Sequence, residues 1–591
     1  MVTFTVSNAN DSGDGSLRKA IASANASPGT DVIEVNSDVT LNSGLEITES
    51  LEIVGNSFTI DQTGSDRLFT IDDGNDDVDS TVSITGLTLT GGMPEDSGGA
   101  ILSLENLEIS HSILTDNFTQ NRGGAVFVDG ANLTIFRSRI ADNAIDTSLM
   151  TSAGGGVFVR SGQLDVSNSE FVNNVAGIAG GLIVVDGTAE IENVLVAENQ
   201  GGGIGIVDDS QLMLSSSTIN DNADGGIIAI NNNSLDISKI EVSNNTAEFA
   251  AGISISDNSD LEIDNSTIAG NQALINSGGI EINNGSTATI AEIAVIDNEA
   301  EEFGGGISIG NDSQVEIDNT TIARNLAIFG GGGIDLFSNS QLEISKSAIT
   351  NNSAEIGGGI AIDDNGRAVV TNSSITENLA LESGGAVDVF NNSQLEVVSS
   401  IIADNSELDG ASITADETST VDIINSVVEG AVGDIEGDIS AITADETNPD
   451  FDIGDISDDL TEAEPSLEFV PELGDDTDEG SQDEDLLIDD ESAEVLDGDL
   501  GFDIVEGSSD ENTLFGNSSS ELFIIDPQAD TVTIEDFDVA SDVIGLSEGT
   551  TYDELDISGS DAASISLGDR TIAVLSDVAA ESLNSEQFIE L

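Results

Sequence analysis

The sequence predicts an all-β fold, a parallel β-helix of about 15 coils with three short strands in each coil. One observation behind this prediction is a unit of about 26 residues that repeats from residue 98 to residue 405, with a glycine run opening each copy. A second observation is the alternation of apolar and polar residues inside each copy, as at Ile307, Ile309, Val315 and Ile317. A unit this small cannot bury its own apolar face, so successive copies must stack.

Each copy is expected to contribute a glycine run, three strands and the turns between them. The clearest copy, Gly304 to Ala327, reads GGGISIGNDSQVEIDNTTIARNLA. A period of two places Ile and Val on one face of each strand and Ser, Asp or Asn on the other. The glycines allow a positive φ or a close backbone approach at the corner before the first strand. Apolar ladders are therefore expected inside the coil, with each coil pairing with the next at about 4.8 Å.

A third repeating feature is an asparagine near the end of each copy. Its side chain can pair with turn amides that would otherwise stay unpaired inside the coil. We therefore expect these asparagines to stack as structural residues. They are Asn271, Asn298, Asn325, Asn352, Asn378 and Asn405.

The composition excludes several classes of partner and site. The chain has 113 Asp and Glu residues against 12 Lys and Arg residues, a formal net charge of −101. Phosphate binding needs a basic face, so nucleic acid is excluded as an expected partner, and binding to anionic lipid is disfavoured. The absence of cysteine excludes disulfides, thiolate zinc sites and a cysteine nucleophile. No apolar run approaches 18 residues, so no helix is expected to span a membrane.

The N-terminal residues 1–30 are expected to form a cap. Ser16 is placed to cap a short helix whose Leu17, Ala20, Ile21 and Ala24 share one face. The stretch from Asn10 to Val35, NDSGDGSLRKAIASANASPGTDVIEV, resembles the N-terminal cap of bacterial right-handed β-helix surface proteins, and the later repeats are similar to those of the same group. This resemblance implies a right-handed coil, with the β-helix at residues 31–430. The start of the chain lacks the basic and apolar regions of a secretory signal peptide.

The C-terminal part of the chain has a different pattern. Residues 431–479 are interpreted as an acidic linker. From residue 480 a nine-residue period follows Gly480, Asp489, Gly498, Gly507 and Gly516. Residues 480–591 resemble a degenerate calcium-binding β-roll of the RTX (hemolysin) type with the domain that follows such repeats in exported bacterial proteins.

The RTX resemblance implies calcium as cofactor and the type I secretion machinery as partner, with the export signal at the C-terminus. The implied calcium ligands are Asp485, Glu494, Asp503 and Glu521. The alternative is that these repeats have lost specific binding, and that divalent ions only gather weakly around the acidic surface.

No catalytic residue is assigned from the sequence. Enzymes on this fold use convergent carboxylates with a basic partner. The only histidine, His111, is interpreted as a solvated turn residue. Arg137, Arg139 and Arg160 on neighbouring coils form either a small cationic spot or a set that neutralises nearby acids. The chain has no Trp and one Tyr, and its 20 Phe residues are expected to lie mostly in the core.

The sequence therefore favours a non-enzymatic, secreted or cell-surface protein of the adhesin or extracellular-matrix type. An extracellular polysaccharide or a cell surface is the expected partner. One alternative is a polysaccharide lyase or related carbohydrate-active enzyme on the same fold. Another is a calcium-dependent glycan-binding module.

Overall fold

The computed structural model describes residues 1–428 except 76–79, 148–151 and 408–410, then residues 431–432, 438–442 and short segments between 478 and 590. The chain divides into two compact units, residues 1–467 and 468–591. The finer boundaries expected at residues 30, 430 and 479 stay predictions.

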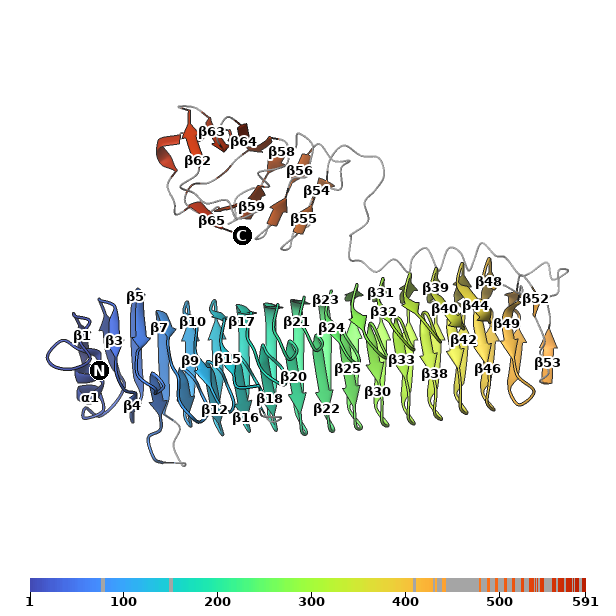
Figure 1. The fold of residues 1–591 in the computed structure, drawn as a ribbon, viewed down its shortest axis with the longest axis horizontal. Helices are drawn as coiled ribbons and strands as arrows, with labels where there is room; N and C mark the ends of the chain where they lie inside the picture. Colours follow the sequence, from blue (N-terminus) through green and yellow to red (C-terminus); the bar gives the residue numbers. More distant parts are fainter. Residues whose placement is uncertain are drawn as a thin grey trace. The chain divides into compact units, whose positions relative to one another are not determined.

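The described part of the first unit is a stack of parallel strands in three sheets, which we name sheets A, B and C (Figure 1). Sheet B has 16 strands, one in each coil, which agrees with the predicted coil number to within one. Its strands are β4 (Leu45–Ile47), β6 (Phe69–Ile71), β8 (Ile101–Ser103), β12 (Val126–Asp129), β16 (Val157–Arg160), β18 (Leu182–Val185), β20 (Ile204–Val207), β22 (Ile227–Ile230), β25 (Ile253–Ser256), β29 (Ile280–Ile282), β33 (Ile307–Ile309), β37 (Ile334–Leu336), β41 (Ile360–Ile362), β45 (Val387–Val389), β49 (Ala411–Ala415) and β52 (Ala431–Val432).

Sheet A contains two strands, or one long strand, from each coil. Its 28 described strands are β1 (Thr3–Val6), β2 (Asp31–Val35), β3 (Val39–Leu41), β5 (Leu51–Gln62), β7 (Thr81–Thr90), β9 (Asn106–Ser110), β10 (Ile113–Thr115), β13 (Leu133–Phe136), β14 (Arg139–Ala141), β17 (Gln163–Val172), β19 (Thr188–Ala197), β21 (Gln211–Asn220), β23 (Ser234–Ser243), β26 (Asp260–Asp264), β27 (Thr267–Ala269), β30 (Thr287–Ala291), β31 (Ala294–Ile296), β34 (Gln314–Asp318), β35 (Thr321–Ala323), β38 (Gln341–Ser345), β39 (Ala348–Thr350), β42 (Arg367–Thr371), β43 (Ser374–Thr376), β46 (Gln394–Val398), β47 (Ile401–Ala403), β50 (Thr420–Ile424), β51 (Val427–Val428) and β53 (Asp438–Ile442).

Sheet C is the short third side of the coil. Its seven described strands are β24 (Thr246–Ala247), β28 (Gln272–Ala273), β32 (Glu299–Ala300), β36 (Leu326–Ala327), β40 (Ser353–Ile356), β44 (Leu379–Ser383) and β48 (Ser406–Glu407). An equivalent pair earlier in the chain is β11 (Phe118–Thr119) and β15 (Ala144–Ile145).

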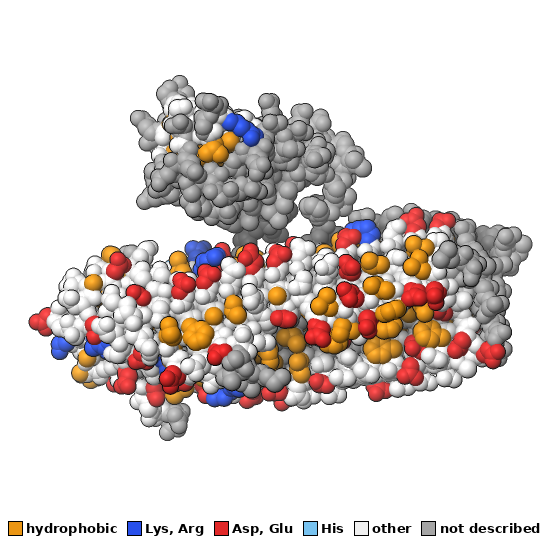
Figure 2. Space-filling view, viewed as in Figure 1, with side chains coloured by type: hydrophobic (Ala, Val, Ile, Leu, Met, Phe, Trp, Pro, Cys, Tyr) orange, Lys and Arg blue, Asp and Glu red, His pale blue; other side chains and the backbone are white. Residues whose placement is uncertain are grey.

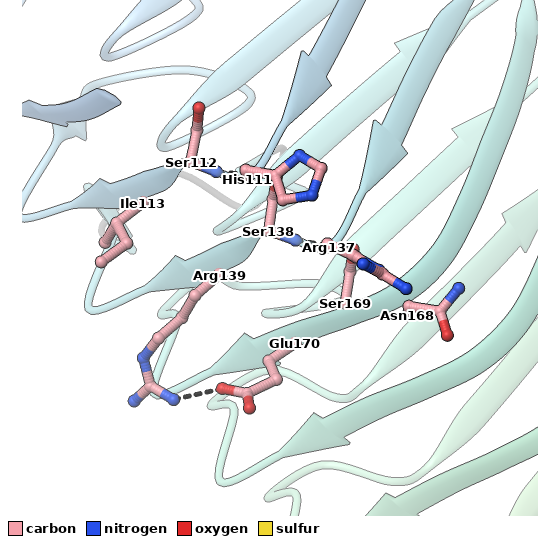
Figure 3. Close-up of a pocket in the computed structure, with 9 residues that line it drawn as sticks. All are labelled: His111, Ser112, Ile113, Arg137, Ser138, Arg139, Asn168, Ser169 and Glu170. Atoms are coloured by element: carbon pink, nitrogen blue, oxygen red, sulfur yellow. Dashed lines mark hydrogen bonds and ion pairs between the residues drawn. The ribbon is translucent and has the colours of Figure 1, made fainter. Parts of the chain in front are cut away.

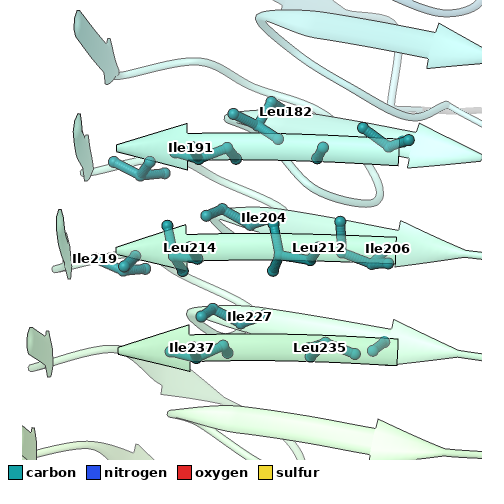
Figure 4. Close-up of a cluster of buried hydrophobic side chains, with 14 of the residues drawn as sticks. Leu182, Ile191, Ile204, Ile206, Leu212, Leu214, Ile219, Ile227, Leu235 and Ile237 are labelled. Carbon is teal, nitrogen blue, oxygen red and sulfur yellow. The ribbon is translucent and has the colours of Figure 1, made fainter. Parts of the chain in front are cut away.

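The core is a set of apolar ladders, as the sequence predicts. Ile253 pairs with Ile280, Ile280 with Ile307, Ile307 with Ile334, and Ile334 with Ile360. All five side chains are fully buried. Figure 4 shows the same arrangement from Leu182 to Ile237, where side chains of successive coils lie one above another inside the solenoid. Each coil thus buries its apolar face against its two neighbours.

Helix α1 (Leu17–Ala24) lies at the N-terminal end of the stack (Figure 1). The Ser16 hydroxyl accepts a hydrogen bond from the backbone N–H of Lys19 at 3.3 Å. Its buried face consists of Leu17, Ala20, Ile21 and Ala24, and the helix packs on β1, β2 and β4.

Each coil has two corners along sheet A, and at each corner one residue adopts the left-handed backbone conformation in successive coils. At the serine corner this residue precedes a buried serine in most coils, as Lys346 precedes Ser347. At the asparagine corner it precedes a buried asparagine, as Asn351 precedes Asn352.

The described strands of the second unit form two sheets. One contains β54 (Asp478–Glu479), β56 (Val495–Asp497), β58 (Thr513–Phe515), β60 (Val532–Glu535), β64 (Arg570–Leu575), β63 (Ala563–Leu567) and β62 (Leu555–Ser558), and the other contains β55 (Leu486–Ile488), β57 (Ile504–Glu506), β59 (Leu522–Ile525), β61 (Val543–Leu546) and β65 (Phe588–Glu590). Successive strands from β54 to β61 alternate between the two sheets. Leu486 pairs in parallel with Ile504, and Ile504 with Leu522, so strands of one sheet recur at twice the predicted nine-residue period.

Candidate functional sites

The six asparagines expected to stack belong to a longer hydrogen-bonded column at the asparagine corner. Asn271 shows the pattern: its backbone N–H and its Nδ2 both donate to Oδ1 of Asn298, at 3.0 and 2.9 Å. Its Nδ2 also donates to the carbonyl oxygen of Val242 at 2.8 Å. The column contains Asn117, Asn143, Asn174, Asn199, Asn222, Asn245, Asn271, Asn298, Asn325, Asn352, Asn378 and Asn405. Its role is structural, because it satisfies polar groups inside the coil.

A surface hollow of about 450 Å³ lies at the serine corner of three early coils (Figure 3). His111, Arg137 and Asn168 occupy the left-handed position on successive coils, with φ of 50, 46 and 49°. Arg139 and Glu170 follow on β14 and β17 and form an ion pair. The buried Ser112, Ser138 and Ser169 separate these two rows of side chains.

An aromatic ring organises the cationic side of this hollow. The His111 ring meets the Phe136 ring edge-on, with 5.5 Å between the ring centroids. The Arg137 guanidinium carbon lies 5.1 Å from the centre of the same ring, which is a cation–π distance. Among the described residues, Arg137 forms no ion pair. His111 is an exposed turn residue, as the sequence predicts, and it also lines this hollow, which we name the cationic hollow after Arg137 and Arg139.

Arg160 does not belong to the cationic hollow, although the sequence grouped it with Arg137 and Arg139. It lies on sheet B, where its Nε donates to Oδ1 of Asp129 at 2.7 Å. The hydrogen bond with Asp129 raises the pKa of Arg160. The spacing of residues in the sequence does not show on which of the three sides of a coil each residue lies, so it could not separate Arg160 from the other two arginines.

A row of partly or fully buried carboxyl groups lies on the outer face of sheet B. The outward residues Glu281, Ser308, Asp335, Ala361 and Asp388 pair in register from β29 to β45. Asp335 is only 6% exposed and Asp388 only 8%. We name Glu281, Asp335 and Asp388 the acid row, in which the members lie two coils apart.

Asp335 is the most perturbed group of the acid row. Burial, together with the charge of Asp363, raises the pKa of Asp335 to about 8. Burial also raises the pKa of Glu281, against a hydrogen bond from the Ser254 hydroxyl at 2.9 Å. At neutral pH Asp335 is therefore a protonated carboxylic acid, able to donate a hydrogen bond or a proton. A carboxyl group perturbed in this way marks a candidate functional site.

Three phenylalanines are exceptions to the expectation that most of these residues lie in the core. Phe303 and Phe329 come just before β33 and β37, and their ring centroids are 6.0 Å apart. They are 40% and 45% exposed, and Phe249 is 51% exposed. These residues occupy corners, where the two-residue alternation of a strand no longer decides which side chains point inward.

The acid row was missed in the sequence, although a signal for it exists. Each member is the second residue of the strand that follows a glycine run, as in GGIEI, GGGIDL and GGAVDV. The alternation marks this position as outward-facing, and outward-facing acids are ordinary in so acidic a chain. Only the structure shows that neighbouring residues cover them.

The implied calcium ligands Asp485, Glu494, Asp503 and Glu521 lie outside the described residues. Within the described ranges, no group of three or more His, Cys, Asp or Glu side chains is arranged to hold a metal ion. Among the same residues, none of the helices has the length and apolar character needed to cross a membrane.

Comparison with solved structures finds distant likenesses. The D-to-A variant of the periplasmic alginate epimerase AlgG is 12% identical, with a TM-score of 0.32, over 64% of this chain and 77% of that one. Tailspike protein 3 of bacteriophage CBA120 is 11% identical, with a TM-score of 0.29, over 71% of this chain and 61% of that one. At these TM-scores neither structure carries an argument about function. No curated protein matches the chain.

One protein family does match part of this chain. The family described as "right handed beta helix region" matches residues 155–322 and 278–448. These ranges contain most of the parallel strands of sheets A, B and C from β16 onward. This match and the stacked parallel sheets show that the first unit has the right-handed parallel β-helix fold.

Proposed function

We propose that this chain is a non-enzymatic, secreted or cell-surface protein of the adhesin or extracellular-matrix type. The observation that carries the proposal is the in-register stack, whose buried asparagine column repeats from Asn117 to Asn405. Such a stack is stiff along its length and displays outward side chains at a fixed spacing of about 4.8 Å. An extended surface with repeated side chains suits binding to a polymer or a cell surface.

The outer face of sheet A supports an extracellular setting. Its central outward position holds exposed acids on many coils, including Glu262, Glu316 and Glu343. Together with the net charge of −101, this surface suits surroundings rich in salt or divalent ions, which screen repulsion between like charges.

The test is a binding assay with a parallel assay for turnover. Labelled full-length protein is incubated with cells and extracellular polysaccharide of the source organism, and bound label is measured against protein concentration. We expect saturable binding that heat-unfolded protein does not show. We expect no new unsaturated ends when acidic polysaccharides are incubated with the protein and calcium. Robust turnover would contradict the proposal.

The acid row supports a second candidate, a polysaccharide lyase or related carbohydrate-active enzyme. Glu281 and Asp335 are two coils apart, which places their Cα atoms at about 9.6 Å. Inverting glycosidases hold their two carboxyl groups about 6.5–9.5 Å apart and keep one of them protonated. Asp335 would be the general acid, and Glu281 or Asp388 the second carboxyl group.

A matched pair of variants tests this candidate. Asp335→Asn removes the buried acid, and Glu343→Gln removes an exposed acid from sheet A of the same coil. If the chain is such an enzyme, Asp335→Asn abolishes turnover and Glu343→Gln leaves it unchanged. The wild-type rate falls as the pH rises through about 8, the pKa of Asp335. Equal rates for both variants would exclude the acid row from catalysis.

Asp335 also predicts a pH dependence of stability. Its pKa in the folded protein is raised, so its contribution is fully present below the unfolded value of about 4 and is lost as the pH rises through about 8. Wild type should lose a few kcal/mol relative to Asp335→Asn across this window. Urea unfolding of both proteins at pH 4 and pH 9 measures the difference.

We further propose that residues 480–591 serve export through a type I system and bind calcium. The support is the recurrence of parallel strands at 18-residue intervals, from Leu486 to Ile504 and Leu522. Deletion of residues 480–591 should keep the protein inside the cell, and normal secretion of the deletion would refute the export role. Calorimetry of the full chain with calcium should show stoichiometric heat that Asp485→Ala/Asp503→Ala reduces.

A further inference from the structure

One outward column of sheet C alternates between acidic and apolar side chains. The paired strands β24, β28, β32, β36, β40 and β44 each contribute or directly precede one member. In chain order the members are Glu248, Leu274, Glu301, Ile328, Glu355 and Leu381. Leu274, Ile328 and Leu381 are 61%, 51% and 52% exposed. We name this column the apolar–acidic stripe.

Further exposed apolar residues lie beside the stripe. Phe249, Phe303 and Phe329 belong to the corner that follows, and Leu326 and Leu379 belong to the strands themselves. Figure 2 shows apolar side chains gathered between acidic ones over the segment that Figure 1 labels β32, β40 and β44. Soluble proteins rarely expose a contiguous apolar patch unless it binds something.

The charge around the stripe selects a cationic partner. The segments 246–251, 272–277, 299–304, 326–331, 353–357 and 379–383 contain no Lys or Arg. Burial and the neighbouring charge of Glu382 raise the pKa of Glu355, so these two carboxylates repel each other. A cation between them would relieve that repulsion, whereas a second copy of this acidic chain would add to it.

The spacing along the stripe selects a backbone conformation for that partner. Equivalent side chains recur every two coils, or about 9.6 Å. A polyproline II helix repeats after three residues of 3.1 Å, or about 9.3 Å. An α-helix has a pitch of 5.4 Å, and a strand returns to the same face after about 6.8 Å. Of these regular conformations, only polyproline II stays in phase with the stripe.

We propose that the apolar–acidic stripe docks a basic, proline-rich segment of a partner protein in the polyproline II conformation. One residue in three, a Lys or Arg, lies over a glutamate of the stripe. The two residues between them, prolines, pack on Leu274, Ile328 or Leu381 and on the exposed phenylalanines, as aromatic-lined surfaces do with such segments. This inference rests on the proposed surface-binding function and names its partner class.

The test uses the full chain and synthetic peptides. Fluorescence anisotropy measures binding of labelled (Lys-Pro-Pro)6 and of (Lys-Gly-Gly)6, which has the same charge but a flexible backbone. We expect the proline peptide to bind about tenfold more tightly, because its backbone is preorganised. Binding should weaken as salt is added, because the charge contacts are exposed.

Two variants with matched controls locate the binding surface. Leu274→Ser/Ile328→Ser/Leu381→Ser should weaken binding of the proline peptide at least about tenfold. Its control, Ile113→Ser/Met213→Ser/Ile424→Ser, removes exposed apolar residues outside the stripe. Glu248→Gln/Glu301→Gln/Glu355→Gln should also weaken binding. Its control, Glu190→Gln/Glu262→Gln/Glu316→Gln, makes the same charge change on sheet A.

Several outcomes would overturn the inference. Equal affinity for the two peptides, or equal effects of the variants and their controls, would mean non-specific charge attraction. Preferential binding of glucosamine oligomers would assign the stripe to a cationic glycan, and self-association lost in the apolar variant would assign it to a second copy. If the labelled chain binds cells but not the proline peptide, this inference fails while the proposed function stands.

Discussion

The serine corner and the asparagine corner of one coil share a backbone conformation but differ in their side chains. In the coil from β38 to β40, Lys346 and Asn351 have φ of 47 and 56°, and each precedes a buried polar residue. At the serine corner the Ser347 hydroxyl accepts from the backbone N–H of Thr320 at 3.1 Å and donates to the carbonyl of Ser345 at 2.7 Å. At the asparagine corner the Asn352 side chain bridges three coils. The stability of the asparagine corner therefore depends more on its buried side chain than the stability of the serine corner does.

The two corners also differ in the charge of the left-handed residue. The asparagine corner carries one base, Arg324, and seven acids, namely Asp116, Asp142, Glu198, Asp221, Asp297, Glu377 and Asp404. The serine corner carries one, Glu292, and also holds His111, Arg137, Lys239 and Lys346. The left-handed backbone favours Asn and Gly at both corners, so it does not explain the difference in sign.

Neighbouring acids account for part of the difference in charge, at Lys239 and Lys346. At the serine corner the preceding residue is acidic on several coils, and Lys346 pairs with one such residue, Asp318, at 3.5 Å. At the asparagine corner the preceding residues, such as Ala269, Ile296 and Thr350, carry no acid in any coil from Thr115 to Ala403. The fold fixes the backbone at each corner, and at Lys346 the neighbouring Asp318 favours a base.

The largest expected effect is loss of an asparagine from the column. Asn298→Ala removes the acceptor for the backbone N–H and the Nδ2 of Asn271 and the donor to the carbonyl of Ile268. Because these groups stay buried without a partner, we expect about 2–4 kcal/mol of lost stability, measured by urea unfolding. A loss below about 0.5 kcal/mol would mean that water replaces the side chain and that the column is not essential.

A serine from the other corner should cost less. Ser347→Ala leaves one buried group, the backbone N–H of Thr320, without its acceptor. We expect a loss of about 1–2 kcal/mol in the same measurement, smaller than for Asn298→Ala. If the serine variant is as destabilised as the asparagine variant, the two corners are equivalent and the comparison fails.

The sequence predicts these regular features well, because a repeat reports the same environment many times. The ladder from Ile253 to Ile360 follows from apolar alternation and a fixed period. The burial of Asp335, the exposure of Phe329 and the placement of Arg160 could not be predicted in this way. These three features depend on which residues cover the outer surface of a coil and on which side of the coil a corner residue lies. The alternation of apolar and polar residues predicts neither of these.

The apolar–acidic stripe is an intermediate case. Its members are 26 or 27 residues apart, so the alternation between Glu301, Ile328 and Glu355 becomes visible only when the copies are aligned coil by coil. The register of sheet C supplies that alignment. The structure thus shows which residues of neighbouring repeats are aligned where the repeats differ in length.

Backbone strain should affect both corners equally. Asn319 at the serine corner and Asn351 at the asparagine corner have φ of 48 and 56°. Replacing either by Ala should cost about 1 kcal/mol, because a Cβ disfavours this conformation, whereas Gly should be nearly neutral. Thermal unfolding of the four single variants gives the values. A difference between the two corners larger than the Ala–Gly difference would show that their backbones are not equivalent in energy.

The smallest expected effect comes from exchanging charge at the exposed positions. Lys239→Glu places an acid at the serine corner, beside Asp264 of the next coil. Because the two acids repel each other, the substitution should destabilise the folded protein by about 0.5 kcal/mol at low salt. Asp221→Lys removes an acid from the asparagine corner, where adjacent coils carry Glu198 and Asn244, and should stabilise by a similar amount. Both effects should largely disappear in 1 M salt, where the screening length falls to about 3 Å. Effects that persist in high salt would mean that packing, and not charge balance, separates the two corners.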